Sequence, residues 1–283
     1  MKIIDAHLHF ADSEGLKKTA REIAEVDYSA GGLRREFSEA GIVAGVVMTA
    51  PMRDPSQITG DPLDLTLEDG TLENLFFCVG VNPEKLQKDS GELLRIEKGL
   101  QQRRATGIKI YAGYFPYYVY DPVYEPVYEL AAKYHVPVAV HCGDTQWAHG
   151  LLKYSHPLTI DEVAVNHPDL TFIICHLGVP WVMDTAELIA KNPNVYADLS
   201  GIAAGNNTQV RGMKDVRPYV ELIQQGLVYA NRYDKVLFGT DWPLVPIAPY
   251  VNFIKEIIPE KYHEDVFYRN ALAVFPKIKD NLK

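Results

Sequence analysis

Short apolar runs rich in Val, Ile and Phe recur along the chain and alternate with longer stretches of mixed polarity. Eight such runs lie at residues 2–10, 43–50, 75–83, 106–114, 136–144, 170–178, 195–201 and 235–241. Several of them are apolar at nearly every position, which is typical of strands that are buried on both faces of a parallel sheet. The pattern therefore predicts eight parallel strands.

Helical patterns fall between these runs. Residues 84–104, 122–135 and 159–167 each carry apolar side chains at helical spacing. Thr159 and Glu162 are three residues apart and predict a capping box at the start of the third helix. A strand followed by a helix, repeated eight times, is the pattern of a (β/α)8 barrel.

An open, doubly wound sheet is the alternative arrangement of parallel strands and helices. Dinucleotide-binding sheets of that kind carry a Gly-x-Gly-x-x-Gly segment after the first strand, and this chain has none there. We therefore predict an α/β fold, a TIM-like (β/α)8 barrel that forms a single domain over residues 1–283.

Composition and charge narrow the classes of partner. The 283 residues are 47% hydrophobic and have a formal net charge of −9, which disfavours binding to nucleic acid or to an anionic membrane. No apolar run reaches the roughly 18 residues of a membrane span. Asp5, His7 and His9 interrupt the first run, so a signal peptide is not predicted. We expect a cytoplasmic protein with a small-molecule substrate, and a homo-oligomer stays open.

The three cysteines are few and far apart in the sequence. Cys78, Cys142 and Cys175 each lie in an apolar run, and their number is odd. Reduced, buried thiols are expected rather than disulfides or a zinc ribbon. Strand alternation turns Cys142 away from the side of His141, towards the helix layer, which predicts a packing role.

Polar residues gather where the predicted strands end. The active sites of TIM barrels lie at the carboxyl ends of the strands. In this chain those ends carry His7 and His9, Lys109, His141, His176, Asp198 and Asp241. Four of the nine histidines therefore meet at one end of the predicted barrel.

The first strand carries two of these histidines on one side. Since side chains alternate with a period of two, His7 and His9 point the same way, about 6–7 Å apart. Two imidazoles so placed can chelate one metal ion, and Asp5 on the same side could fix the tautomer of one ring. A row of core histidines is the structural alternative. The joint position of the other strand-end residues favours the metal site.

The ordered set of these motifs resembles the amidohydrolase superfamily and, within it, the amidohydrolase-related family of metal-dependent hydrolases. The resemblance covers essentially the whole chain and is carried by the His-x-His of the first strand and by the segments GIKIY, VAVHCG, ICHLG, NVYADLSG, VLFGTDWP and RNALAVF. It implies one divalent ion, commonly Zn²⁺ with Mn²⁺ as the alternative, on His7, His9, His141 and Asp241. His176 would lie beside the ion.

Lys109 leaves two interpretations open. It matches the strand-four lysine that bridges two metal ions as a carbamate in some members of the superfamily. The alternative is an ion pair at the strand end beside a one-metal site. We favour the one-metal interpretation, although the number of ions stays open.

The reaction is less well defined than the site. Zn²⁺ at such a site lowers the pKa of a bound water from 15.7 to about 7. This favours hydrolysis of a small lactone, ester or amide, with Asp241 as the proton-transfer group and His176 hydrogen-bonded to the water or the substrate oxygen. The alternative is non-oxidative decarboxylation of a hydroxylated aromatic or unsaturated acid, with Asp241 protonating carbon. A catalytically silent barrel is a third reading, and the complete ligand set speaks against it.

Aromatic and basic residues near the strand ends are candidates for substrate binding. A flat or apolar small molecule would suit an aromatic lining, although tyrosines in such loops often only pack. Arginines could bind a substrate carboxylate, although surface arginines are more common. The candidates are Tyr111, Trp147, Trp181, Trp242, Arg53 and Arg211. The identity of the substrate does not follow from the sequence.

Overall fold

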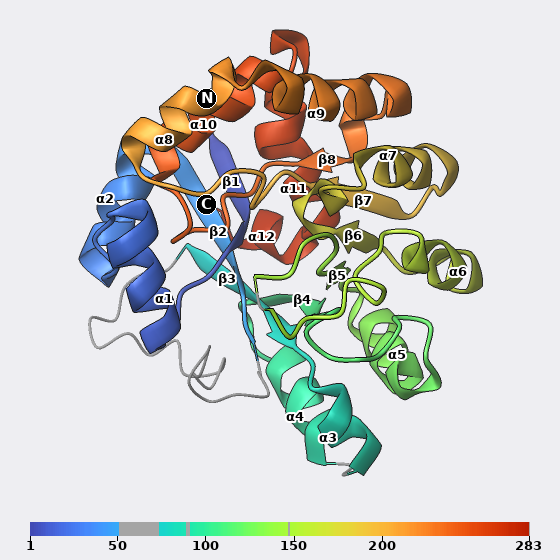
Figure 1. Ribbon diagram of the computed structural model, residues 1–283. Helices are drawn as coiled ribbons and strands as arrows, with labels where there is room; N and C mark the ends of the chain where they lie inside the picture. The colour runs from blue at the N-terminus through green and yellow to red at the C-terminus, as the bar shows by residue number, and fades with distance from the viewer. Residues whose placement is uncertain (51–73, 89–90, 147, 283) are drawn as a thin grey trace.

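Eight parallel strands form the centre of the computed structural model, which describes residues 1–50, 74–88, 91–146 and 148–282 (Figure 1). They pair in sequence order within one sheet. Their bounds are β1 Ile3–Leu8, β2 Ile42–Met48, β3 Leu75–Gly80, β4 Ala105–Ile110, β5 Val138–Val140, β6 Phe172–Ile174, β7 Val195–Asp198 and β8 Val236–Leu237. Each strand lies within one of the apolar runs or overlaps it, so the eight predicted strands are confirmed.

The sheet closes between its first and last strands. The backbone N–H of Ala6 donates to the carbonyl of Phe238 at 2.9 Å, and the N–H of Asp241 donates to the carbonyl of His7 at 2.8 Å. These bonds join β1 to the segment directly after β8. The predicted (β/α)8 barrel is therefore confirmed.

Helices surround the strands (Figure 1). The α-helices are α1 Glu14–Thr19, α2 Ala30–Ala40, α3 Pro83–Lys88, α4 Gly91–Leu100, α5 Glu125–Tyr134, α6 Thr159–Asn166, α7 Val182–Lys191, α8 Asn207–Gly212, α9 Arg217–Ala230, α10 Ile247–Ile257, α11 Asn270–Val274 and α12 Pro276–Asn281. Short 3₁₀ or π segments are η1 Ala20–Ala24, η2 Pro122–Tyr124, η3 Cys175–Gly178, η4 Met213–Asp215, η5 Tyr233–Lys235, η6 Glu260–Tyr262 and η7 Asp265–Arg269. No helix in the described part of the chain is both long and apolar enough to span a bilayer.

The start of α6 differs from the prediction. Its first helical residue is Thr159, and the residue before it, Leu158, has no side chain that could cap the helix. The Thr159 hydroxyl donates instead to the carbonyl of His156 at 2.8 Å. The predicted capping box is therefore wrong, because its threonine lies inside the first turn rather than at the position before it.

The C-terminal helices close one end of the barrel. α12 follows β8 in sequence but contacts β4, which lies across the barrel. Phe275 and Ile278 are fully buried in one apolar cluster with strand residues such as Ile4 and Phe76. The Lys277 ammonium donates to the carbonyl of Leu100, just before β4, so this is the end where the strands begin. The opposite end, where the strands finish, is left for the polar residues.

The three cysteines are free thiols and all are buried. Cys78 and Cys175 belong to the apolar cluster inside the barrel. Cys142 belongs to the other cluster, which fills the space between strands and helices. The expected packing role of Cys142 is therefore confirmed, and so is the absence of disulfides.

Candidate metal centre

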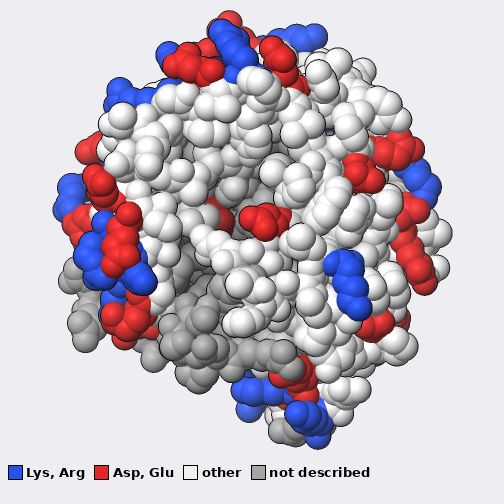
Figure 2. Space-filling model, in the orientation of Figure 1, with Lys and Arg blue, Asp and Glu red and all other residues white. Residues whose placement is uncertain are grey.

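Two histidines and an aspartate meet where β1 and β8 finish. His7 is the fifth residue of β1, His9 follows that strand, and Asp241 follows β8. The Oδ1 atom of Asp241 lies 3.4 Å from Nε2 of His7 and 3.0 Å from Nε2 of His9. The space-filling view in the orientation of Figure 1 shows a hollow near the middle of the molecule, with acidic side chains inside it (Figure 2). One potential ligand atom from each of His7, His9 and Asp241 therefore lies within 4.8 Å of the other two, and the predicted ligand His141 is not part of this group.

The other ring nitrogens of these two histidines face hydrogen-bond acceptors. Nδ1 of His7 lies 2.9 Å from Oδ2 of Asp198, and Nδ1 of His9 lies 3.0 Å from the carbonyl of Met48. A carboxylate and a carbonyl only accept, so each Nδ1 carries the proton. In the neutral rings, Nε2 is then an unprotonated lone pair that faces Asp241.

His141 and His176 likewise each have one ring nitrogen that faces a backbone carbonyl and therefore carries the proton. Nε2 of His141 donates to the carbonyl of Asp144 at 2.9 Å, and Nδ1 of His176 lies 3.2 Å from the carbonyl of Ser200. Their remaining nitrogens, Nδ1 of His141 and Nε2 of His176, lie 3.1 Å apart and face each other. In the neutral rings neither of these two nitrogens has a proton to share.

Burial favours the neutral form of the rings of His7, His141 and His176. Burial, and after it the nearby charge of Lys109, lower the pKa of His7 to about 3. Burial, followed by the influence of His176, holds the pKa of His141 well below its ordinary value. Burial also lowers the pKa of His176.

The contacts of the cluster are incomplete without a cation. Within the described part of the chain, Nε2 of His7 and Oδ1 of Asp241 are buried and have no hydrogen-bond partner. Unpartnered buried polar atoms are rare in folded proteins and call for a missing partner. Unprotonated imidazole nitrogens around a carboxylate are the donor set of Zn²⁺ and related divalent ions. The residues present therefore fit a divalent metal ion.

Unusual backbone conformations bring the side chains together. His176 and Asp241 have positive φ angles of 60° and 61°, which are uncommon for residues with a side chain. Gly201 comes close to both. A Cβ atom at Gly201 would lie 2.6 Å from Nδ1 of His176 and 3.0 Å from Oδ2 of Asp241. Left-handed residues of this kind cluster at functional sites.

Asp198, rather than Asp5, holds the His7 ring. The carboxylate of Asp5 accepts from the backbone N–H groups of His7 and Thr240 and from the Thr240 hydroxyl, and contacts no imidazole through a hydrogen bond. The expectation that Asp5 fixes a histidine tautomer is therefore wrong. The pairing of β1 with β2 shifts between Asp5 and Leu8, so regular alternation does not hold there.

Lys109 lies inside the barrel and is fully buried. Its ammonium donates to Sγ of Cys175 at 2.8 Å and lies 5.3 Å from the centre of the Tyr111 ring. Among the described residues, no carboxylate lies within ion-pairing distance of it. The expected ion pair of Lys109 is therefore not formed among the described residues, and the carbamate stays the untested alternative.

The aromatic residues that were predicted to line the substrate site differ in burial and contacts. Tyr111 is buried, and its hydroxyl donates to the carbonyl of Met48 at 3.2 Å. Trp242 is fully buried and stacks on Tyr28, so its ring packs rather than lines a surface. Trp181 is partly exposed and its ring lies 4.6 Å from that of His156. Trp147 and Arg53 lie outside the described residues.

Tyr114 was not predicted as a site residue. Its ring stands edge-on to that of His141, with centroids 4.8 Å apart. The hydroxyl accepts from the backbone N–H of Gln146 at 3.2 Å. The sequence offered a signal only in the general richness of this loop in tyrosine.

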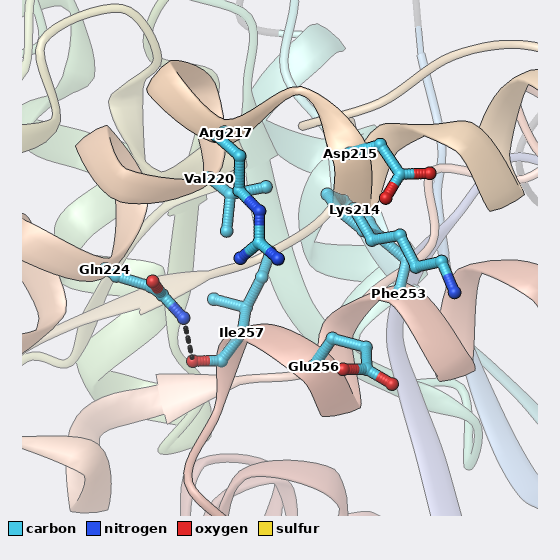
Figure 3. Close-up of a pocket in the computed structure, with 8 residues that line it drawn as sticks. All are labelled: Lys214, Asp215, Arg217, Val220, Gln224, Phe253, Glu256 and Ile257. Carbon is cyan, nitrogen blue, oxygen red and sulfur yellow. Dashed lines mark hydrogen bonds between the residues drawn. The ribbon is translucent and has the colours of Figure 1, made fainter.

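Arg211 lines a surface groove rather than the cluster. The groove has a volume of about 240 Å³ and is lined by residues of α8, η4 and α10, among them Lys214, Phe253 and Glu256. These three also line a neighbouring cavity of about 210 Å³, where Gln224 donates to the carbonyl of Ile257 (Figure 3). None of the four histidines lines either cavity, so Arg211 is not placed beside them.

Comparison with known families identifies the class of protein. A family model described as amidohydrolase matches residues 4–277. The chain therefore belongs to the amidohydrolase family, which confirms the resemblance found in its motifs. Members of this family are metal-dependent enzymes and include both hydrolases and decarboxylases. A search of curated proteins found no match.

Several solved structures share the fold. A TIM-barrel protein of Bordetella bronchiseptica is 20% identical with a TM-score of 0.71, and the match covers 99% of this chain and 100% of that chain. A probable 2-pyrone-4,6-dicarboxylic acid hydrolase of Acinetobacter baumannii is 15% identical with a TM-score of 0.65, over 98% and 100% of the chains. A 5-carboxyvanillate decarboxylase of Novosphingobium aromaticivorans, complexed with manganese, is 15% identical with a TM-score of 0.64, over 97% and 96%.

Proposed function

We propose that the protein is a metal-dependent hydrolase of a small carbonyl compound, a lactone, ester or amide. The ion would be held by His7, His9, His141 and Asp241, with Zn²⁺ as the first choice and Mn²⁺ as the second. The proposal rests on which ring nitrogens of the four histidines carry a proton. Each histidine directs one ring nitrogen at an acceptor outside the cluster. The second nitrogens of His7 and His9 face Asp241, and those of His141 and His176 face each other.

The chain's own groups supply the proton steps. A divalent ion bound here would lower the pKa of water and polarise a carbonyl oxygen. Asp241 is the carboxylate at the centre of the cluster, so it would accept a proton from the attacking water and pass it to the leaving group. His176 presents an unprotonated Nε2, so it would accept a hydrogen bond from that water and orient its lone pair. A substrate oxygen would need a protonated His176, which burial disfavours.

Decarboxylation of a hydroxylated aromatic or unsaturated acid is the second candidate. It is favoured by the fold shared with the manganese-containing 5-carboxyvanillate decarboxylase. In that reaction Asp241 would deliver a proton to the carbon that loses CO₂, rather than accept one from water. Asp241 would therefore serve both reactions, with the leaving group as the proton acceptor in hydrolysis and carbon as the proton acceptor in decarboxylation.

One screen separates the two reactions. Purified protein, supplied with Zn²⁺ or Mn²⁺, is offered lactones, esters, amides and hydroxylated aromatic acids, and both acid release and CO₂ are recorded. Hydrolysis of a lactone, ester or amide yields acid without CO₂, and this is the expected result. CO₂ from an aromatic acid would replace the first proposal by the second. Metal-loaded protein that converts no compound would favour a catalytically silent barrel.

A further inference from the structure

We propose that Asp198 is a positioning residue that fixes which nitrogen of His7 carries the proton. The inference rests on the proposed function, because it matters most if Nε2 of His7 binds a metal ion. Asp198 is the last residue of β7, which β8 separates from β1, and it is not one of the four proposed ligands. Its side chain and that of His7 are both buried.

The two oxygens of this carboxylate have different partners. Oδ1 accepts from three donors, which are the backbone N–H of His176 at 2.9 Å, the backbone N–H of Ser200 at 3.1 Å and the Ser200 hydroxyl. Oδ2 faces Nδ1 of His7 at 2.9 Å. Three donors therefore hold one oxygen in place and aim the other at the ring.

The Ser200 hydroxyl confirms the direction of the ring proton. Its single proton goes to Asp198, yet its oxygen lies 3.0 Å from Nδ1 of His7 and 2.9 Å from Nδ1 of His176. Two neighbouring nitrogens that meet an oxygen without a proton to offer must be donors themselves. Both rings are therefore held with the proton on Nδ1.

This arrangement requires a carboxylate and not merely a side chain of the same shape. If an asparagine replaced Asp198, its amide oxygen would take the place of Oδ1, because only an oxygen can accept from three donors. Its NH₂ group would then face Nδ1 of His7. Since an amide NH₂ only donates, the ring would have to accept there and carry its proton on Nε2. That proton would occupy the position proposed for the metal ion.

The test compares Asp198→Asn with Asp5→Asn in metal-free protein. Asp5 is the matched control, because it is a buried carboxyl two residues from His7 that accepts from backbone groups and the Thr240 hydroxyl and not from a ring. The protein is labelled with ¹⁵N-histidine, and the ring ¹⁵N shifts of His7 report its tautomer, with a His7→Gln variant to assign the signal. We expect the Nδ1–H form in the parent and in Asp5→Asn, and the Nε2–H form in Asp198→Asn.

Metal affinity provides the second readout. Titration with Mn²⁺, followed by the electron paramagnetic resonance of the free ion, should show a loss of about 10- to 100-fold in Asp198→Asn, as for other groups that orient a histidine ligand. An Nδ1–H form of His7 in Asp198→Asn would overturn the inference. So would an Nε2–H form in the parent, and this measurement does not depend on whether the variant folds.

The two readouts also separate this inference from the proposed function. If the tautomer changes and the Mn²⁺ affinity does not, the positioning role stands and His7 is not a ligand. If the affinity falls while the tautomer stays, the positioning role is wrong. Asp198 would then act as a ligand itself, since its carboxylate, His7 and Cys175 also lie close enough to share an ion.

Discussion

The two ends of the barrel differ in the kind of side chain that they gather. At the end where the strands begin, α11 and α12 fill the space with apolar side chains such as Val274, Phe275 and Ile278. At the end where the strands finish, His7 and Asp241 place unpartnered polar atoms a few ångströms apart. Buried polar groups without partners destabilise a fold. The first end therefore serves stability, and the second keeps an unfavourable arrangement that a bound cation would relieve.

The largest expected effect is on turnover at the polar end. Asp241→Asn removes the only carboxylate at the centre of the proposed ligand set, and proton transfer by a placed side chain is worth about 10²–10⁴-fold. We expect kcat to fall by about that factor on whichever substrate the screen identifies. A steady-state assay of metal-loaded protein measures it. Near-normal turnover would remove Asp241 from the proton steps of both candidate reactions.

A substitution at the apolar end should lower the stability of the protein and leave metal binding unchanged. Phe275→Ala leaves a cavity in the closed end and should lower the free energy of unfolding by about 3–5 kcal/mol. The bound metal should be unaffected, because the ring lies in the cluster of the C-terminal helices. Urea unfolding and metal content are the two measurements. Loss of metal from folded Phe275→Ala would show that the two ends are not independent.

A smaller effect on stability and metal binding is expected when a methyl group is added at Gly201, beside the cluster. Gly201→Ala combines a positive φ of 62° with a Cβ that would crowd His176 and Asp241. Gly41→Ala is the matched control, since it has a φ of 76° but its Cβ would meet only the Met1 carbonyl at 3.4 Å. Both should lose about 1–2 kcal/mol of stability from the backbone alone. Only Gly201→Ala should also weaken Mn²⁺ binding, and equal affinities in the two variants would contradict the close packing of the site.

The fold was predictable because strands that are buried on both faces appear in the sequence as continuous apolar runs. The strands of a closed barrel must be apolar on both sides, and runs such as residues 75–83 show this without any knowledge of tertiary contacts. The strand-end positions of His7, His141 and Asp241 follow from the same pattern once a barrel is assumed.

The contacts around the cluster were less predictable because they depend on small departures from regular structure. The register shift after Asp5 sends its carboxylate to Thr240 and leaves the His7 ring to Asp198. Trp242 follows Asp241 directly, yet its ring turns into the packing beside Tyr28. The contacts of Ser200 could not be predicted, because an isolated serine after a strand is common. Regular alternation cannot foresee any of these details.

The central claim is that the polar end of the barrel binds a divalent ion through the unprotonated ring nitrogens of its histidines. Elemental analysis of protein purified without added metal, and again after loading with Zn²⁺ or Mn²⁺, tests it most directly. We expect about one equivalent of bound ion in the parent and in His263→Ala, whose ring contacts two backbone carbonyls and the Phe267 ring. Almost none is expected in His7→Ala. Two equivalents would instead favour a carbamate on Lys109. Less than about a tenth of an equivalent in the parent, with no gain on loading, would contradict the account.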